Sequence, residues 1–403
     1  METLELESMA PLVARDDFIF LQGNRRVYLD NSSTSLKPMK VINALTGYYR
    51  DAGSNVGRSN HRYAEAATGL YEATRLELAY FLNCAADEVI FTANCTDAIN
   101  LAANTLSLIR GDHVVISPLE HHSNLLPWLA FCDVSVVRLD EEGLVDLDYL
   151  DSLLASKPAK LIAVCHASNI TGNIQPVADI CKIAKRRGTL TLIDAAQTVG
   201  HIPVDVESIG CDFLAFSGHK MLGPSGVGVL FACKEVQSSM QCNRQGGGMV
   251  NKVDGNEVTF QTGPARFEAG TPNIEGVIGL GAALGYLSDI GYKRIQQHDH
   301  SLETYFSKKI QSVPHLYFPF ATSKHHLPIF TFVPEGGIDV GFISRILSDK
   351  YDIAISSGFQ CNQPLYRDRG LNGGLRVSMH LYNTQDDIDR FVNAMTDLQK
   401  LMA

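Results

Sequence analysis

The sequence lacks the features of a membrane-spanning, secreted or metal-clustered protein. It contains no run of about 18 apolar residues, the length that a membrane-spanning helix requires. Its acidic first residues, Met-Glu-Thr-Leu-Glu-Leu-Glu-Ser, do not follow the basic-then-apolar order of a signal peptide. The nine cysteines are odd in number and form no Cys-x-x-Cys pair. We therefore expect reduced thiols, no bound metal and a cytoplasmic location.

An excess of basic charge is absent too. Lys and Arg number 34 against 44 Asp and Glu, which gives a formal net charge of −10. This balance offers no attraction to nucleic acid or to an anionic membrane, so we expect neither as a partner. With 403 residues, of which 45% are apolar and 19% charged, the chain is long enough for one large globular domain and a smaller one.

Short apolar runs alternate with helical patterns through the first two thirds of the chain. Strands are predicted at 88–91, 113–117, 135–139, 161–165, 189–193, 213–216 and 227–231. Helices are predicted at 39–50, 64–82, 96–106 and 177–187. This alternation predicts an α/β fold with a mostly parallel sheet flanked by helices.

The pattern changes towards the C-terminus. Residues 245–271 show weak periodicity, and two long helices are predicted at 275–291 and 293–312. The segment from 327 onwards reads as a compact α+β unit, with strands at 328–333, 353–355 and 375–378 and helices at 340–349 and from 385 to the end. We expect an N-terminal extension (1–26) packing with the small domain, a large domain (27–285) and a small C-terminal domain (286–403).

Lys220 lies in a tight polar loop between two predicted buried strands. Ser217 and His219 flank it, and the glycines and proline of the loop cannot continue either strand. Burial lowers the pKa of a lysine and favours the free amine that forms a Schiff base with an aldehyde. Taken alone, the motif also fits a surface turn with a solvated lysine.

Polar side chains follow five of the predicted strands at the points where the strands end. They are Asn94, Cys95 and Thr96; Glu120, His121 and His122; Asn169; Asp194 and Gln197; and Ser217, His219 and Lys220. Ligands of open parallel sheets bind beyond the carboxyl ends of the strands, so we expect these side chains to share one pocket. Singly, each has an alternative role, such as a helix N-cap for Asp194 or Thr96.

These residues suit pyridoxal 5'-phosphate as the aldehyde. Asp194 would keep the pyridine nitrogen protonated, and Gln197 would bond the phenolic oxygen. His121 would stack on the ring and shuttle protons. At the other end, the N–H groups that open the helix at 94–98 suit a phosphate. Side-chain donors from Thr96, Ser217 and His219 would complete that phosphate site.

Two further candidates lie in the small domain. Arg376 sits on a predicted strand, where a lone cation needs a partner, and a substrate carboxylate gripped by two bonds would serve. Cys361 lies in a Gly/Asn/Pro loop and is the one cysteine outside an apolar or helical context. It is therefore the best candidate for a reactive thiol, with an incidental surface thiol as the alternative.

Several motifs together resemble the group II cysteine desulfurases, which include the selenocysteine lyases and belong to the class V aminotransferase family. The similarity runs from about Tyr28 to Val392. The motifs that carry it are 212–231, Glu120-His-His-Ser-Asn124, Ile193-Asp-Ala-Ala-Gln197, Arg266-Phe-Glu-Ala-Gly-Thr-Pro-Asn273 and Arg376-x-Ser-x-x-x-Tyr-Asn383. The resemblance implies a fold type I pyridoxal-phosphate enzyme whose cofactor is bound by the large domain. It also implies a homodimer with sites at the subunit interface.

The same resemblance implies particular roles for site residues. Lys220 would carry the cofactor, and Thr271 of the other subunit would join the phosphate site. Asn169 and Arg376 would hold the substrate carboxylate, and Cys361 would take the sulfur of L-cysteine and release L-alanine. A sulfur-acceptor protein is a further possible partner.

The chain departs from this family where the thiol is presented. Ser356, Phe359 and Gln360 replace the arginine and histidine usual around the cysteine, and Cys95 stands where a threonine is usual. These changes keep two alternatives open. One is a pyridoxal-phosphate C–S β-lyase, or specialised sulfur-handling enzyme, acting on a cystine- or thiocysteine-like substrate. The other is a non-catalytic sulfur-transfer partner, which the Lys220, Asp194 and His121 set disfavours.

Overall fold

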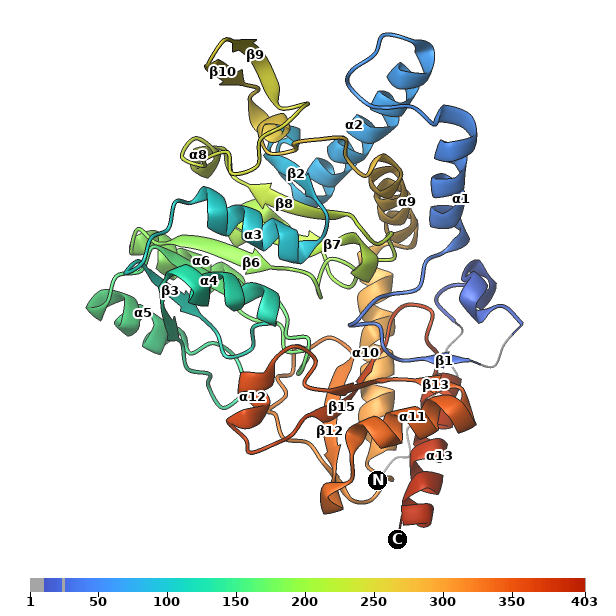
Figure 1. Cartoon of the computed structure of the whole chain (residues 1–403). Helices are drawn as coiled ribbons and strands as arrows, with labels where there is room; N and C mark the ends of the chain where they lie inside the picture. The colour runs from blue at the N-terminus through green and yellow to red at the C-terminus, as the bar shows by residue number, and fades with distance from the viewer. Residues whose placement is uncertain (1–10, 24–25, 403) are drawn as a thin grey trace.

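The computed structural model describes residues 11–23 and 26–402, and a seven-stranded sheet organises its larger part (Figure 1). The strand order is β2-β8-β7-β6-β5-β3-β4. The strands are β2 (Val89–Thr92), β3 (His113–Ile116), β4 (Asp133–Val136), β5 (Leu161–Cys165), β6 (Leu190–Asp194), β7 (Phe213–Ser217) and β8 (Gly228–Ala232). Strands β4, β3, β5, β6 and β7 pair in parallel, whereas β8 is antiparallel to both of its neighbours.

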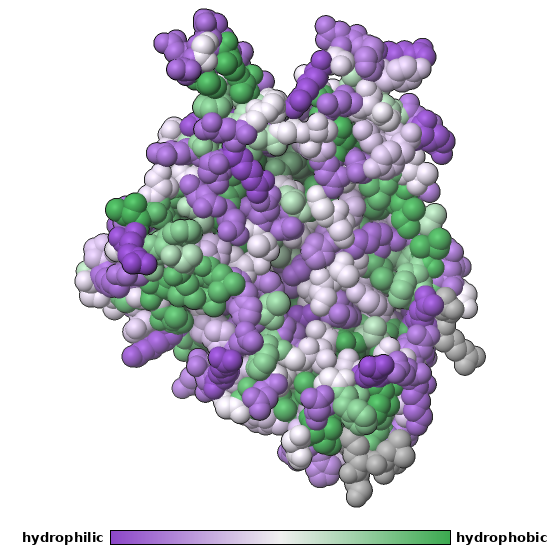
Figure 2. Space-filling model, viewed as in Figure 1, coloured by the Kyte–Doolittle hydropathy of each residue, from purple (hydrophilic) through white to green (hydrophobic). Residues whose placement is uncertain are grey.

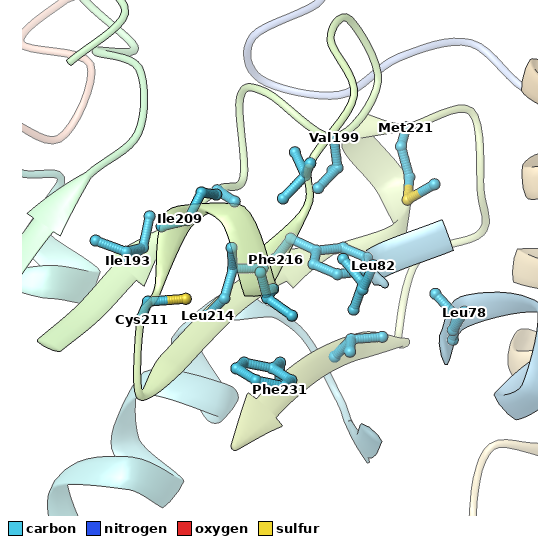
Figure 3. Close-up of a cluster of buried hydrophobic side chains, with 14 of the residues drawn as sticks. Leu78, Leu82, Ile193, Val199, Ile209, Cys211, Leu214, Phe216, Met221 and Phe231 are labelled. Atoms are coloured by element: carbon cyan, nitrogen blue, oxygen red, sulfur yellow. The ribbon is translucent and has the colours of Figure 1, made fainter. Parts of the chain in front are cut away.

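Successive residues of the central strands face opposite layers of helices, as the pleat of a strand requires. On one side, Leu192 and Phe213 pack with α3 (Cys95–Thr105) and α4 (Leu126–Phe131). On the other side, their neighbours Ile193 and Leu214 join one core with α2, α5, α6 and α9, part of which Figure 3 shows. These four helices span Arg62–Leu82, Leu147–Ser156, Val177–Arg186 and Ile274–Ile290. Both faces are therefore buried, which explains the near-continuous apolar strands.

A second, smaller sheet lies in the C-terminal part, with the order β11-β12-β15-β14 and antiparallel pairing throughout. Its strands are β11 (Leu316–Tyr317), β12 (Ile329–Pro334), β14 (Ser356–Gly358) and β15 (Gly374–Ser378). A separate core, which includes Phe306, Phe332, Leu347 and Phe391, joins this sheet to three helices. These are α10 (Tyr292–Ile310), α11 (Val340–Tyr351) and α13 (Gln385–Met402).

The N-terminal segment connects these two parts. Strand β1 (Val27–Tyr28) pairs in parallel with β13 (Ile353–Ala354), and Asp30 forms an isolated bridge with Ser378. Further back, Phe18 is fully buried in the core of the large sheet, whereas Arg15 pairs with Asp387 of α13 at 3.2 Å.

The remaining elements are short or peripheral. They are α1 (Met39–Gly47), α7 (Val206–Ile209), α8 (Lys234–Gln237), α12 (Gln363–Arg367), and the hairpin of β9 (Val250–Asp254) and β10 (Glu257–Phe260). Figure 2 shows apolar atoms gathered over α4, where Leu126, Leu129 and Phe131 are exposed. Within 11–23 and 26–402, no single helix is long and apolar enough to cross a bilayer. Helices α9 and α10 meet that test only as a pair bent by 78°.

The predicted fold class is confirmed, and most predicted elements are present within a few residues. The strand predicted at 135–139 is shifted and spans 133–136, and the helix predicted at 39–50 ends at Gly47, where a π-turn (Tyr48–Ala52) takes over. Helix α5 and the β9–β10 hairpin were not predicted. Part of the predicted N-terminal extension, residues 1–10 and 24–25, lies outside the described residues.

Candidate active site

A cavity of about 520 Å³ lies at the carboxyl ends of the parallel strands, where the sequence predicts a shared pocket. The predicted site residues that line it are Asn94, Cys95, Thr96, His121, Asn169, Asp194, Gln197, Ser217, His219, Lys220, Cys361 and Arg376. Most of these residues follow the ends of strands β2, β3, β5, β6, β7 and β14, and Arg376 lies on β15. The large and the small sheet therefore both contribute to the cavity.

Lys220 ends a single 3-10 turn (Gly218–Lys220) directly after β7. Ser35 of the N-terminal segment is hydrogen-bonded to this turn and to the residues that follow it. The Ser35 N–H donates to the His219 carbonyl at 3.0 Å, and the Ser35 hydroxyl accepts from the Leu222 N–H at 2.8 Å. Burial lowers the pKa of Lys220, Asp194 raises it, and Arg376 lowers it further. Since the net direction is downward, the lysine is more readily available as a free amine.

Asp194 ends β6 and is 6% exposed. Its Oδ1 accepts from the Ala196 N–H at 2.9 Å and from the Cys95 thiol at 3.3 Å. Burial raises the pKa of this carboxyl, and the Ala196 N–H, Lys220 and the Cys95 thiol oppose that rise.

His121 follows β3 and lines the same cavity. Its Nδ1 accepts from the Ser123 N–H at 3.1 Å, and burial together with Lys220, His122 and Arg376 lowers its pKa to about 3. The ring is therefore neutral at ordinary pH and offers a flat uncharged face.

The buried carboxyl of Glu120 holds the loop that carries His121. It accepts from the Ser117 hydroxyl at 2.5 Å, the Asn124 amide at 2.6 Å and the Cys165 N–H at 2.9 Å. Burial raises the pKa of Glu120 to about 7 despite these three donors.

The N-terminus of α3 forms one end of the cavity. Asn94 caps the helix by accepting from the Asp97 N–H at 2.9 Å, and the Cys95 N–H donates to the Ser217 hydroxyl at 2.8 Å. Thr96 and Ser123 share a hydrogen bond of 2.7 Å between their hydroxyls. A helix N-terminus with hydroxyls beside it suits a phosphate. His219 faces the same cavity, and burial together with Lys220 and Lys37 lowers its pKa to about 4.

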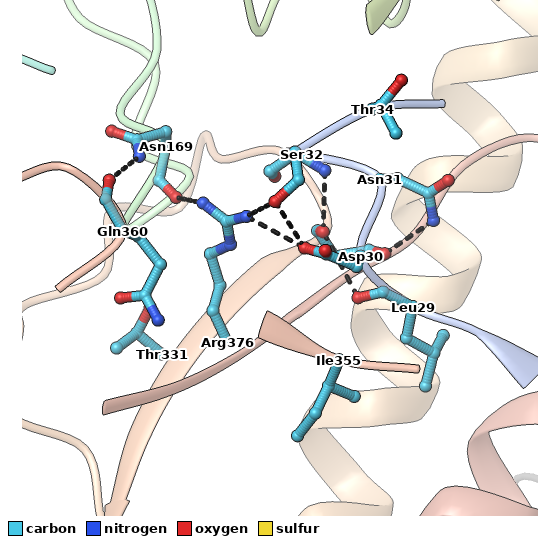
Figure 4. A network of polar contacts seen from close by, with 12 residues as sticks. Leu29, Asp30, Asn31, Ser32, Thr34, Asn169, Thr331, Ile355, Gln360 and Arg376 are labelled. Carbon is cyan, nitrogen blue, oxygen red and sulfur yellow. Dashed lines mark hydrogen bonds and ion pairs between the residues drawn. The ribbon is translucent and has the colours of Figure 1, made fainter. Parts of the chain in front are cut away.

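Arg376 is not the lone cation that the sequence suggests. Its Nη2 lies 3.1 Å from Asp30 Oδ1 and donates to the Ser33 hydroxyl at 2.9 Å, while Nη1 donates to the Asn169 carbonyl at 3.0 Å (Figure 4). The expectation was wrong because Asp30 comes from the N-terminal segment, which reaches Arg376 through the β1–β13 pairing and the Asp30–Ser378 bridge. The Arg376 Nε is buried and has no hydrogen-bond partner among the described residues.

Cys361 is the one exposed cysteine of the nine. Its loop contains two left-handed residues, Gln360 (φ 39°) and Cys361 (φ 59°), and is held on the large domain by three hydrogen bonds. The His122 N–H donates to the Cys361 carbonyl at 2.8 Å, the Asn169 amide to the Gln360 carbonyl at 2.9 Å, and the Asn362 amide to the Pro118 carbonyl at 3.1 Å. The thiol is thus held at a set position on the rim of the cavity.

Not all of the predicted residues meet in the cavity. Glu120 and His122 support it from behind and do not line it, and Thr271 is exposed outside the lining of its own chain. Residues that the sequence analysis missed include Ser32, Ser33, Ser123 and Cys165, which line the cavity. The polar stretch Asn31-Ser-Ser-Thr-Ser35, shortly after β1, was the available signal for Ser32 and Ser33.

The arrangement fits pyridoxal phosphate on three grounds. The amine of Lys220 has a lowered pKa, and Asp194 directs one carboxylate oxygen to protein donors and keeps the other unbonded by any described residue. The start of α3 offers helix N–H groups beside the hydroxyls of Thr96 and Ser217. The sequence analysis did not predict a second contact of Gln197. Its side-chain amide donates to the Ser32 carbonyl at 3.1 Å and so connects the segment after β6 to the N-terminal segment.

Comparisons with known proteins agree with this arrangement. Residues 27–391 match the aminotransferase class-V family. The chain is 36% identical to a probable cysteine desulfurase of Halalkalibacterium halodurans over 98% of this chain and 97% of that protein. It is 35% identical to a cysteine desulfurase of Cronobacter sakazakii, with 99% and 98% covered.

Solved structures give the same result. An apo cysteine desulfurase from Thermococcus onnurineus superposes with a TM-score of 0.91 at 36% identity, covering 98% of this chain and 99% of that one. A cysteine desulfurase of Escherichia coli in an S-sulfonic acid form superposes with a TM-score of 0.88 at 34% identity, covering 96% and 98%.

Proposed function

This chain belongs to the aminotransferase class-V family, and on that basis we propose that it is a pyridoxal-phosphate-dependent cysteine desulfurase. It transfers sulfur from L-cysteine to its own Cys361 and releases L-alanine. One observation carries this proposal: a single cavity is lined by Lys220 and Asp194 together with Arg376 and the exposed Cys361.

Three residues of the large domain serve the cofactor. When bound, pyridoxal phosphate supplies an electron sink for the bond changes at the substrate α-carbon. The buried carboxylate of Asp194 would hold a proton at the ring nitrogen, and the neutral imidazole of His121 would lie against the ring. Lys220 would supply the attaching amine. The same amine can take the α-proton of the substrate, because its lowered pKa favours the free-base form.

Arg376 and Asn169 select an α-carboxylate. By the donor inventory of arginine, Nε–H and one N–H of Nη1 remain after its bonds to Asp30, Ser33 and Asn169. The Nη1 donor can bind a carboxylate while Asp30 holds the guanidinium in place, whereas the Nε–H is buried. Asn169 contributes by fixing both Arg376, through its carbonyl, and the Cys361 loop, through its amide.

Sulfur transfer requires the Cys361 sulfur to act as a nucleophile. A new S–S bond forms between Cys361 and the substrate sulfur as the substrate C–S bond breaks. The carbon takes up a proton and leaves as alanine, while Cys361 keeps the sulfur as a persulfide. The left-handed backbone at Gln360 and Cys361 holds the thiol on the cavity rim, where it can both reach the substrate and pass sulfur outward.

The substitution Cys361→Ala tests the proposal. The variant should bind cofactor and cysteine as the wild type does but release alanine at least 100-fold more slowly, because no other exposed thiol exists among the nine. Cys132→Ala, which changes a half-buried thiol outside the cavity lining, is the matched control. Wild-type rates in Cys361→Ala, or pyruvate in place of alanine, would establish the β-lyase alternative. That alternative is favoured by the Gln360 side chain, which bonds Tyr366 and Gly374 rather than the thiol.

The assembly and partners are finer parts of the same proposal. We propose a cytoplasmic homodimer in which Thr271 of one subunit joins the phosphate site of the other, and a sulfur-acceptor protein that collects sulfur from Cys361. The exposure of Thr271 on its own chain and the nine free thiols support this. Light scattering should give twice the chain mass. Thr271→Ala should weaken cofactor binding, and unchanged binding would remove Thr271 from the site.

A further inference from the structure

The two carboxylate oxygens of Asp194 are used unequally. Oδ1 accepts two hydrogen bonds, from the Ala196 N–H at 2.9 Å and from the Cys95 thiol at 3.3 Å. No hydrogen bond from any described residue ends on Oδ2, although Asp194 lines the cavity. The donors therefore decide which oxygen is available to a ligand.

Cys95 is held so that its thiol cannot easily turn away from Asp194. It is the first residue of α3, it is 5% exposed, and its own N–H is tied to the Ser217 hydroxyl at 2.8 Å. Burial and the nearby Asp194 raise the pKa of the Cys95 thiol well above its usual value. The sulfur thus keeps its proton and serves as a neutral donor.

We propose that Cys95 is a positioning residue for the cofactor: together with the Ala196 N–H, its S–H occupies Oδ1 of Asp194 and leaves Oδ2 to receive the pyridine nitrogen. This inference rests on the proposed function. It gives Cys95 a task at the ring end of the cofactor, in addition to its place beside the phosphate end. Without the thiol, the carboxylate keeps one fixed donor and can rotate about its bond to the β-carbon.

Three variants test this role. Cys95→Ala removes the donor, Cys95→Ser replaces it with a hydroxyl, and Cys211→Ala is the matched control. Cys211 is also buried, at 6% exposed, but it lies in the core of the large sheet and does not line the cavity. Each protein is stripped of cofactor, its melting temperature is compared with that of the wild type, and pyridoxal phosphate is titrated back by visible absorbance.

Cys95→Ala should raise the dissociation constant of the cofactor about three- to tenfold, the range expected for one hydrogen bond. It should also shift the pH at which the visible absorbance of the bound cofactor changes. Cys95→Ser should restore both properties, and Cys211→Ala should leave both unchanged. Wild-type values in Cys95→Ala, or an equal loss in Cys95→Ser or Cys211→Ala, would overturn the positioning role. Failure of the wild type to bind pyridoxal phosphate would instead overturn the proposed function.

Discussion

At the scale of single residues, two basic side chains of the cavity, Arg376 and Lys220, lie in different electrostatic environments. Arg376 is 2% exposed and is balanced by Asp30 at 3.1 Å, so its charge is permanent and its orientation fixed. Lys220 has no carboxylate within ion-pair distance among the described residues, and its pKa is lowered. The first suits recognition of a constant negative charge, and the second suits reversible covalent chemistry.

Arg376→Lys should weaken cysteine binding much more than cofactor binding. An ammonium at this place can keep the ion pair with Asp30 but cannot also reach Ser33, Asn169 and a substrate carboxylate from a planar group. We expect the KM for cysteine to rise at least about tenfold and the free energy of unfolding to fall by about 1–3 kcal/mol. The exposed pair of Arg345 and Asp349 offers a control, since Arg345→Lys should change neither quantity. An unchanged KM would show that the carboxylate binds elsewhere.

His166 gives a prediction about pH. Burial lowers its pKa to about 4, so the folded protein keeps the ring neutral at pH values where the unfolded chain, with a pKa near 6.5, takes up a proton. The unfolded state therefore binds more protons between pH 4 and 6.5, and the contribution of His166 to stability is lost as the pH falls through this window. The substitution His166→Gln removes the titrating ring and with it this pH-dependent contribution to stability.

We therefore expect the difference in unfolding free energy between His166→Gln and the wild type to change with pH. Between pH 7 and pH 5 it should move by about 2 kcal/mol in favour of the variant, as measured by urea denaturation at each pH. Comparison at pH 8, where the ring is neutral in both states, gives the pH-independent effect of the substitution. A difference that stays constant from pH 8 to pH 5 would show that His166 is protonated in the fold.

At the scale of elements, the site depends on how closely α3 approaches the sheet. Gly228 begins β8, and a Cβ added there would lie 2.6 Å from the Cα of Asn94 and 2.8 Å from the Phe216 carbonyl oxygen. Both neighbours are backbone, so no side chain can move aside. This glycine allows the helix N-terminus that carries Cys95 and Thr96 to reach the cavity.

Gly228→Ala should accordingly lower both stability and cofactor affinity. Overpacking of this kind costs about 1–3 kcal/mol, and any relief requires α3 to move away from the cavity. Gly69→Ala is a useful comparison, because Gly69 lies inside α2 with no atom within 4 Å of an added Cβ. That variant should gain about 0.5–1 kcal/mol and bind cofactor normally. Equal stability of the two variants would mean that β8 can shift without loss.

The elements that the sequence predicted correctly are those with a clear apolar pattern. Strands β5, β6 and β7 are almost fully buried, and α6 has a strongly segregated apolar face. The β9–β10 hairpin was missed because nearly all of its positions are exposed and β9, Val250-Asn-Lys-Val-Asp254, does not alternate between apolar and polar residues. Helix α5 did have a signal, the Asp146 cap and the spacing of Leu147, Leu150 and Leu154.

The candidate site shows the same division. Residues that directly follow a strand, such as Asp194 and Lys220, could be placed from the sequence because the parallel sheet gathers strand ends at one edge. Asp30 and Ser32 could not be placed in this way. Their positions depend on pairing with β13 and β15, which lie more than 300 residues further along the chain.

At the scale of the whole molecule, the segment from Asp30 to Ser35 joins the two cores at the cavity. Asn31 is 4% exposed; its amide donates to the Ser378 carbonyl at 2.7 Å and to Asn383 Oδ1 at 3.1 Å, and its oxygen accepts from the Tyr382 hydroxyl. Ser35, four residues later, holds the Lys220 turn. The relative position of Arg376 and Lys220 therefore depends on this short stretch.

Asn31→Ala should destabilise the protein by about 2–4 kcal/mol, because it leaves the Tyr382 hydroxyl and the Ser378 carbonyl without their buried partner. Urea denaturation provides the measurement. Asn104→Ala, which removes an exposed amide bonded only within α3, should change the free energy of unfolding by less than about 0.5 kcal/mol. If Asn31→Ala also lowered the free energy of unfolding by less than about 0.5 kcal/mol, the segment from Asp30 to Ser35 would not depend on the Asn31 side chain.

The pairing of β1 with β13 has a consequence for how the enzyme is made. Val27 leaves the ribosome long before its partner Ile353, which follows it by 326 residues. The strands of the seven-stranded sheet, by contrast, all lie between Val89 and Ala232, so this sheet can form before Ile353 is synthesised. The strand ends proposed to hold the cofactor thus come together before the Asp30–Arg376 pair can form. A nascent chain should therefore acquire a cofactor-binding surface well before it can turn over cysteine.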